Sequence, residues 1–123
     1  MIVGIGTDIV AVARMAEFQQ RHGARGLEKL LAPSEQLELA TAPDAARFLA
    51  KRFAAKEALG KALGSGLRAP AVMPAIAVVH DEAGKPAFAC APALAEQMAG
   101  MNAHLSISDE RDYAVAFVVL EKA

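Results

Sequence analysis

The 123-residue sequence has few of the residues that stabilise a fold covalently or provide large aromatic surfaces. It contains one cysteine, Cys90, together with one tyrosine and no tryptophan. A single cysteine excludes an internal disulfide and a four-cysteine zinc or redox framework. No segment approaches the ~20 apolar residues that cross a bilayer, and the N-terminal segment lacks the basic leader of a signal peptide. We therefore expect a cytoplasmic protein with no membrane-spanning segment.

A large excess of one charge is also missing, because 13 basic residues face 14 acidic residues. The charges are divided unevenly: residues 1–68 carry ten basic and seven acidic side chains, whereas residues 69–123 carry three and seven. Six of the cations lie within residues 47–68, beside a single acid, Glu57. This pattern favours a local site for an anionic ligand over the long basic surface that binds nucleic acid. We expect no nucleic-acid partner.

What the sequence does contain is enough apolar side chains for one modest core, although 29 of its residues are alanine. A chain of this length buries about two-thirds of its unfolded surface. We therefore expect one domain over residues 1–123.

The distribution of turn residues and apolar residues predicts a mixed fold. Residues 44–63 are the clearest element, a long helix capped by Asp44 and stopped at Gly64. Strands are expected at residues 1–10, 75–79, 87–89, 104–108 and 113–121, and further helices at 11–21, from Ser34, and at 92–99. This order predicts the α+β class, with a small antiparallel sheet packed beside the long helix.

Two cations of the long helix, Arg52 and Lys56, project into the arc of its largest apolar side chains. Buried charges cost free energy unless the side chains extend to water or meet an anion. The sequence leaves two interpretations open, which are extension to water at the edge of the core and contact with an anionic ligand.

Three other charged residues form a possible metal site. Glu57 and Lys61 lie one helical turn apart, which is also the spacing of an ordinary surface ion pair. Asp8 is an acid within an apolar strand, where carboxylates are uncommon. Mg²⁺ needs only one or two protein carboxylates, because water and phosphate oxygens fill its other positions. Spacing alone does not show that Asp8 and Glu57 meet.

Two common phosphate-binding motifs are absent. A dinucleotide fingerprint beginning at Gly4 requires a small residue where Ile9 stands, and a P-loop requires serine or threonine where Ala62 follows Lys61. The glycines at 64 and 66 could contact phosphate through backbone N–H groups, although a simple helix stop is the favoured explanation.

Three segments, GIGTDIV (residues 4–10), FLAKRFAAKEALGKALG (48–64) and HLSISDERDYAVAFVVLE (104–121), together carry a family resemblance. The sequence resembles the holo-acyl-carrier-protein synthase family, whose members are bacterial 4′-phosphopantetheinyl transferases. The resemblance implies the fold of that family and Mg²⁺-dependent transfer of 4′-phosphopantetheine from coenzyme A to a serine of acyl carrier protein, in fatty acid biosynthesis. Adenosine 3′,5′-bisphosphate would be released.

By position, the resemblance implies roles for individual residues. Asp8 and Glu57 match the magnesium ligands, and Glu57 and Lys61 are the expected catalytic residues. The general base is left open between Glu57 and a water molecule, and Asp109, where some relatives have histidine, receives no role. The expected contacts of coenzyme A are Arg52, Lys56, Lys61, Gly64, His104 and Ser106.

Partner surfaces are expected on two elements. Acyl carrier proteins are acidic, so we expect one to dock on the first helix through Arg14, Phe18, Arg21 and Arg25, although a solvated amphipathic helix would look the same. The last strand has two apolar faces, which favours an interface between subunits. The family resemblance implies a homotrimer, in which Asp8 and Glu57 of one protomer face His104 and Ser106 of its neighbour.

Two other functions fit parts of the sequence. A nucleotide- or RNA-binding module could use the basic helix, but the near-neutral charge and the lack of stacking aromatics argue against it. A metal-dependent nucleotide phosphohydrolase is the alternative enzyme.

Overall fold

The computed structural model describes residues 1–123 and has five strands and four α-helices. A 3₁₀ turn at Met73–Ala75 precedes the second strand. The strands are β1 (Ile2–Ala11), β2 (Ile76–His80), β3 (Pro86–Cys90), β4 (Met101–Asp109) and β5 (Tyr113–Lys122), and the helices are α1 (Val12–Leu30), α2 (Pro33–Leu39), α3 (Ala45–Leu63) and α4 (Pro92–Gln97).

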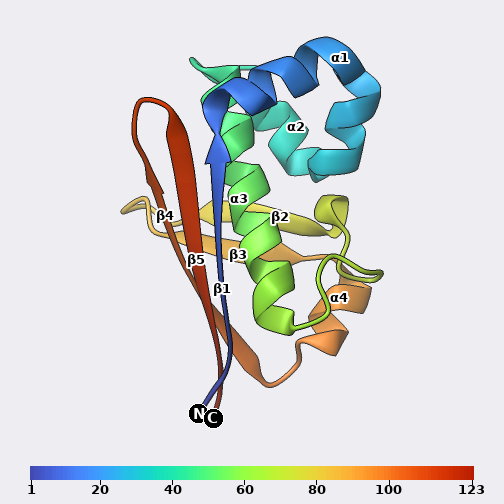
Figure 1. Cartoon of the computed structure of the whole chain (residues 1–123). Coiled ribbons are helices and arrows are strands. Elements are labelled where there is room, and N and C mark those ends of the chain that lie inside the picture. The colour runs from blue at the N-terminus through green and yellow to red at the C-terminus, as the bar shows by residue number, and fades with distance from the viewer.

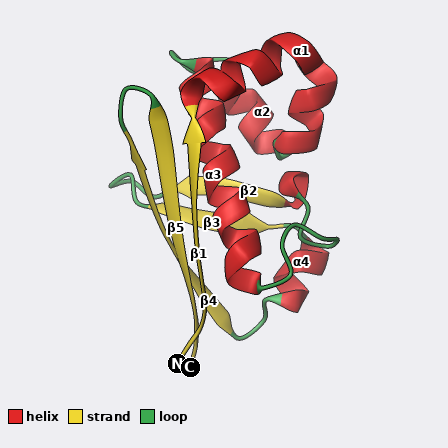
Figure 2. Cartoon of the chain, viewed as in Figure 1, coloured by secondary structure: helices red, strands yellow, loops and turns green.

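The strands form two antiparallel sheets, one of three strands in the order β1-β5-β4 and one hairpin of β2 and β3. Figure 1 shows α3 running alongside the three-stranded sheet, and α1 and α2 lie near the N-terminal end of α3. Figure 2 shows the hairpin crossing the direction of α3. The α+β class, the long helix and the small antiparallel sheet expected from the sequence are confirmed. No helix combines the length and the apolar character needed to span a membrane.

Helix α3 is the centre of the core, because more than half of its residues are buried. Asp44 caps it through a hydrogen bond from the Arg47 N–H at 3.1 Å, and Gly64 ends it in the left-handed conformation at φ 83°. Both ends are where the sequence predicts them. The inner face of the sheet contributes small and branched side chains from β5, which are Ala114, Ala116, Val118 and Leu120.

Two glycines of β1 let α3 approach this strand at backbone distance. A Cβ atom on Gly4 would lie 2.0 Å from the Ala62 carbonyl oxygen, and one on Gly6 would lie 2.0 Å from the Ala58 carbonyl oxygen. Any side chain at either position would push the helix away from the strand. The glycines therefore set the distance between β1 and α3.

Three helix boundaries differ from those expected, and one of them is the end of α4 at Gln97 instead of Ala99. Helix α1 continues to Leu30 instead of ending at Arg21, and Gly23 leaves helical geometry (φ 53°, ψ −144°) at a kink inside it. The chain therefore changes direction near the expected end of the helix, and helical geometry then resumes. Helix α2 begins at Pro33 instead of Ser34, because the Ala32 N–H is satisfied by the Glu35 carboxylate at 2.9 Å.

The outer face of the three-stranded sheet is exposed and largely apolar. Alternation along each strand puts every second side chain on this face. Its exposed apolar members are Ile5 and Ile9 on β1 and Tyr113, Val115 and Phe117 on β5.

We predict that Gly6→Ala lowers the free energy of unfolding by more than about 3 kcal/mol, because the new methyl group meets helix backbone that cannot rotate away. The matched control is Gly100→Ala. Gly100 has φ 81° and open space around a Cβ, so this change costs only backbone strain of about 1–2 kcal/mol. Urea denaturation measures both, and equal losses would contradict the close-packing explanation.

Candidate active site

Strand β1 and helix α3 bring together the three charged residues of the expected metal site. Asp8 lies two residues beyond Gly6 and therefore shares the face of β1 that packs against α3. The Lys61 Nζ atom lies 3.2 Å from Asp8 Oδ1 and donates to the Thr7 carbonyl oxygen at 2.9 Å. The partner of Lys61 is therefore Asp8, not Glu57 one turn away on the same helix.

Glu57 is partly buried and lies close enough to Asp8 for their charges to interact. Burial and then the negative charge of Asp8 raise the pKa of Glu57 above its usual value, with Lys61 and Arg14 opposing this shift. The Asp8 Oδ2 atom is buried and has no hydrogen-bond partner. Two neighbouring carboxylates with an unpartnered buried oxygen suit a divalent cation.

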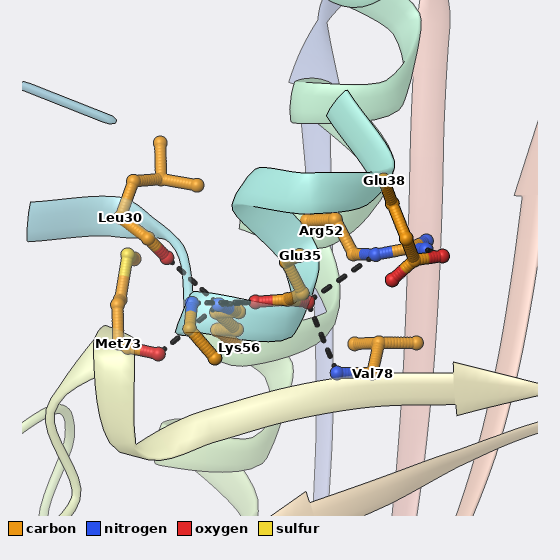
Figure 3. Close-up of polar contacts among 8 residues, drawn as sticks. Leu30, Glu35, Glu38, Arg52, Lys56, Met73 and Val78 are labelled. Atoms are coloured by element: carbon orange, nitrogen blue, oxygen red, sulfur yellow. Dashed lines mark hydrogen bonds and ion pairs between the residues drawn. The ribbon is translucent and has the colours of Figure 1, made fainter. Parts of the chain in front are cut away.

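Lys56 is fully buried and points away from these residues toward Glu35, Leu30 and Met73, as the contacts in Figure 3 show. Its ammonium donates to Glu35 Oε1 at 2.5 Å and to the carbonyl oxygens of Leu30 and Met73 at 2.7 and 3.0 Å. Burial lowers its pKa, and the Glu35 carboxylate opposes this effect. All three protons are used and no surface is exposed, so the structure does not support the expected contact of Lys56 with coenzyme A.

Arg52 shares the Glu35 carboxylate and is nearly buried, but it also pairs with the exposed Glu38. Its Nε atom lies 3.2 Å from Glu35 Oε2, its Nη2 atom donates to Glu38 Oε2 at 3.3 Å, and its guanidinium carbon lies 4.4 Å from the centre of the Phe48 ring. Arg52 also lines a pocket of about 390 Å³. The other side chains of this pocket include Arg47, Phe48, Lys51 and His80. The pocket combines several cations with an aromatic ring, which suits a phosphorylated nucleotide.

Glu35 is the residue that the sequence interpretation missed. The two cations within the apolar arc of α3 signal that an anion lies nearby, and the Glu35 carboxylate pairs with both of them. Periodicity cannot identify which acid supplies it, because Glu35 lies on another helix.

His104 and Ser106 lie on the outer face of the sheet, opposite to the face that carries Asp8. The His104 Nε2 atom lies 3.0 Å from Glu121 Oε1. Within one chain the structure does not bring His104 and Ser106 to Asp8 and Glu57. Gly64 ends α3 one turn beyond Lys61, and its N–H donates to the Lys61 carbonyl oxygen.

The expected docking residues line two adjoining pockets on α1. Arg14, Phe18 and Arg21 line one, and Phe18, Arg21 and Arg25 line the other. The Arg14 guanidinium lies 5.1 Å from the Phe53 ring and is close enough to Glu57 to affect its pKa. This basic and aromatic surface therefore adjoins the carboxylate pair. His22 and Lys29, which the sequence did not single out, also line it.

Asp109 is held by cations of α3. Its Oδ2 atom accepts from Arg47 Nη1 at 3.1 Å, and its Oδ1 atom lies 3.7 Å from Lys51 Nζ. Arg47 also donates to the carbonyl oxygens of Glu110 and Arg111. These contacts fasten the β4–β5 turn to α3.

Comparison with known proteins relates this geometry to one family. Residues 4–118 match the model of the 4′-phosphopantetheinyl transferase superfamily. The chain is 61% identical over 125 residues to the holo-[acyl-carrier-protein] synthase of Dechloromonas aromatica (strain RCB), and the match covers 100% of both proteins. The chain belongs to the holo-[acyl-carrier-protein] synthase family.

Solved structures of this family share the fold over its whole length. The holo-[acyl-carrier-protein] synthase of Neisseria meningitidis has a TM-score of 0.94 and 44% identity, covering 99% of this chain and 100% of that one. The Bacillus anthracis enzyme, solved in complex with CoA (3′,5′-ADP), has a TM-score of 0.86 and 34% identity, covering 100% and 99%. The family, the fold and the enzyme class expected from the sequence are therefore confirmed.

Proposed function

We propose that this holo-[acyl-carrier-protein] synthase transfers 4′-phosphopantetheine from coenzyme A to a serine of acyl carrier protein in a Mg²⁺-dependent reaction. The observation that carries the proposal is the Asp8–Glu57–Lys61 cluster, in which a buried Asp8 oxygen lacks a partner. The family also includes the Bacillus anthracis enzyme, whose crystal structure was solved in complex with CoA (3′,5′-ADP).

Asp8 and Glu57 would hold Mg²⁺, which when bound supplies a Lewis acid for the pyrophosphate of coenzyme A. Lys61 has an exposed, flexible side chain that can turn from Asp8 toward a phosphate. Its positive charge would stabilise the charge that develops as the carrier serine attacks phosphorus. Glu57 or a water molecule beside it would accept the serine proton.

Coenzyme A would lie between two protomers of a homotrimer. Asp8 and the exposed residues His104 and Ser106 belong to opposite faces of one sheet, which supports a site divided between two chains. The exposed apolar side chains of the outer face support an interface between subunits. We propose that Arg52, His104 and Ser106 contact coenzyme A opposite the metal-binding residues of a neighbouring protomer.

Acyl carrier protein would dock on the exposed cations of α1. Arg14, Arg21 and Arg25 attract an acidic partner, and Phe18 adds apolar contact. This surface lies next to Glu57, and a docked carrier protein must bring its acceptor serine close to that residue. We also propose that the protein acts in the cytoplasm, in fatty acid biosynthesis, which uses acyl carrier protein.

Incubation with apo acyl carrier protein, coenzyme A and Mg²⁺ should increase the mass of the carrier by one phosphopantetheine group. Asp8→Asn and Glu57→Gln should each reduce this transfer by about 100-fold or more, because a Lewis acid contributes several kcal/mol to such reactions. The matched control, Glu96→Gln, changes an exposed carboxylate on α4 and should keep full transfer. An unmodified carrier with the folded wild-type protein would contradict the proposed function, and hydrolysis of coenzyme A without transfer would favour a phosphohydrolase.

Charge reversal of the α1 surface should weaken carrier binding selectively. We expect Arg21→Glu to raise the KM for carrier protein about tenfold or more and to change the KM for coenzyme A much less, because charges at an interface act mainly on encounter and affinity. Added salt should raise the wild-type carrier KM. Lys122→Glu reverses an exposed charge near the C-terminus and is the control. Equal carrier KM values in the two variants would exclude this surface.

Assembly can be tested by mixing inactive subunits. Light scattering should give a mass of three chains, and Glu57→Gln subunits mixed with His104→Ala subunits should regain partial activity because some interfaces combine two intact halves. A mixture of Glu57→Gln and Asp8→Asn subunits is the control, since both lack the same half and no rescue is expected. An active monomer, or no rescue after verified subunit exchange, would contradict the shared site.

A further inference from the structure

Glu35 is the most completely buried carboxylate in the molecule, and neither the metal cluster nor the docking surface uses it. Its side chain has no exposed surface, and both carboxylate oxygens have polar partners (Figure 3). Oε1 accepts from the Ala32 N–H at 2.9 Å and from Lys56 Nζ at 2.5 Å. Oε2 accepts from the Val78 N–H at 3.0 Å. One carboxylate thus joins the start of α2 to α3 and β2.

The Glu35 carboxylate also faces the one cation of this cluster that reaches the nucleotide-sized pocket. Arg52 Nε lies 3.2 Å from Glu35 Oε2, an ion pair without the alignment of a hydrogen bond. The rest of the guanidinium is held by Phe48 on one face and by the exposed Glu38 at Nη2. The inner edge of Arg52 therefore faces a buried acid, and the side chain, which is 5% exposed, borders the pocket.

The charges of the cluster leave Arg52 available to an anion. The Lys56 ammonium contacts the Glu35 carboxylate, so these two opposite charges balance within the buried region. Glu35 is shared between Lys56 and Arg52, so it balances one of their two positive charges, and the second is opposed by Glu38, whose side chain is 47% exposed and screened by water. Glu35 can orient Arg52 without cancelling its attraction for phosphate.

We propose that Glu35 is a positioning residue for nucleotide binding, which holds Arg52 at the pocket wall so that its guanidinium meets a phosphate of coenzyme A. Lys56 supports this role by balancing the charge of Glu35. The inference rests on the proposed function, in which Arg52 contacts coenzyme A. A competing explanation is that Glu35 and Lys56 serve only to hold α2, α3 and β2 together.

The test measures binding of adenosine 3′,5′-bisphosphate to the intact protein by calorimetry, in the presence of a chelator so that metal plays no part. The double variant Glu35→Gln/Lys56→Met removes one negative and one positive charge and leaves the net charge unchanged. We expect its affinity to fall about tenfold, because a charged contact that orients Arg52 is lost. Circular dichroism and thermal denaturation establish that the variant is folded.

The matched control is Glu38→Gln, which removes the exposed carboxylate on the same guanidinium and should leave the affinity unchanged or raise it. If nucleotide binding depended only on the net charge around Arg52, removal of the Glu35 or the Glu38 carboxylate would not weaken it. If the double variant does not fold, Glu35→Asp keeps the negative charge beside Lys56 but withdraws it from Arg52, and it should show the same loss of affinity.

A double-mutant cycle separates positioning from a purely structural role. Arg52→Met should weaken binding, and in that background the Glu35 substitutions should cause no further loss. Wild-type affinity in the folded Glu35 variants, or an equal loss in the Arg52→Met background, would overturn the inference and leave the proposed function intact. Wild-type affinity of Arg52→Met itself would instead overturn the proposed contact between Arg52 and coenzyme A, and the inference with it.

Discussion

The close contact between α3 and β1 determines the position of nearly every charged group discussed above. Gly4 and Gly6 present no Cβ to the helix, so the carbonyl oxygens of Ala58 and Ala62 lie against the strand backbone. Asp8 follows on the same face of β1, and Lys61 extends from the neighbouring turn of α3 to reach it. A packing constraint between two backbones therefore sets the geometry of the carboxylate pair, and a wider spacing would separate the carboxylates.

Helix α3 satisfies three different requirements on two sides. One side packs Leu49 and Leu59 into the core and, within the same arc, carries Lys56 toward Glu35, whereas the other side carries Glu57 toward Asp8. A buried ammonium destabilises the fold unless each of its protons has an acceptor. Here Glu35 and two carbonyl oxygens supply the acceptors, so the buried charge also fastens the end of α1 and the segment before β2 to α3.

Local signals made much of the fold predictable, whereas contacts between distant segments did not follow from the sequence. The Asp44 cap, the Gly64 stop and the alternating strands act within a few residues, and the structure confirms them. The resemblance placed Asp8 with Glu57, which spacing alone could not do. The partner of Lys56 and the continuation of α1 beyond Gly23 depend on tertiary packing, and periodicity along one element contains no information about either.

The two-residue period of a β-strand explains why the candidate site is divided. Asp8 shares the α3-facing side of the sheet with Ala116, its partner in the register of β1 and β5. His104 and Ser106 have the opposite parity on their strand from the buried Leu105, so they point away from that side. No rotamer change transfers a side chain through a sheet. In the proposed homotrimer a ligand reaches both groups by lying between two copies of the chain, and the exposed apolar side chains beside His104 and Ser106 provide the surface on which a second copy can pack.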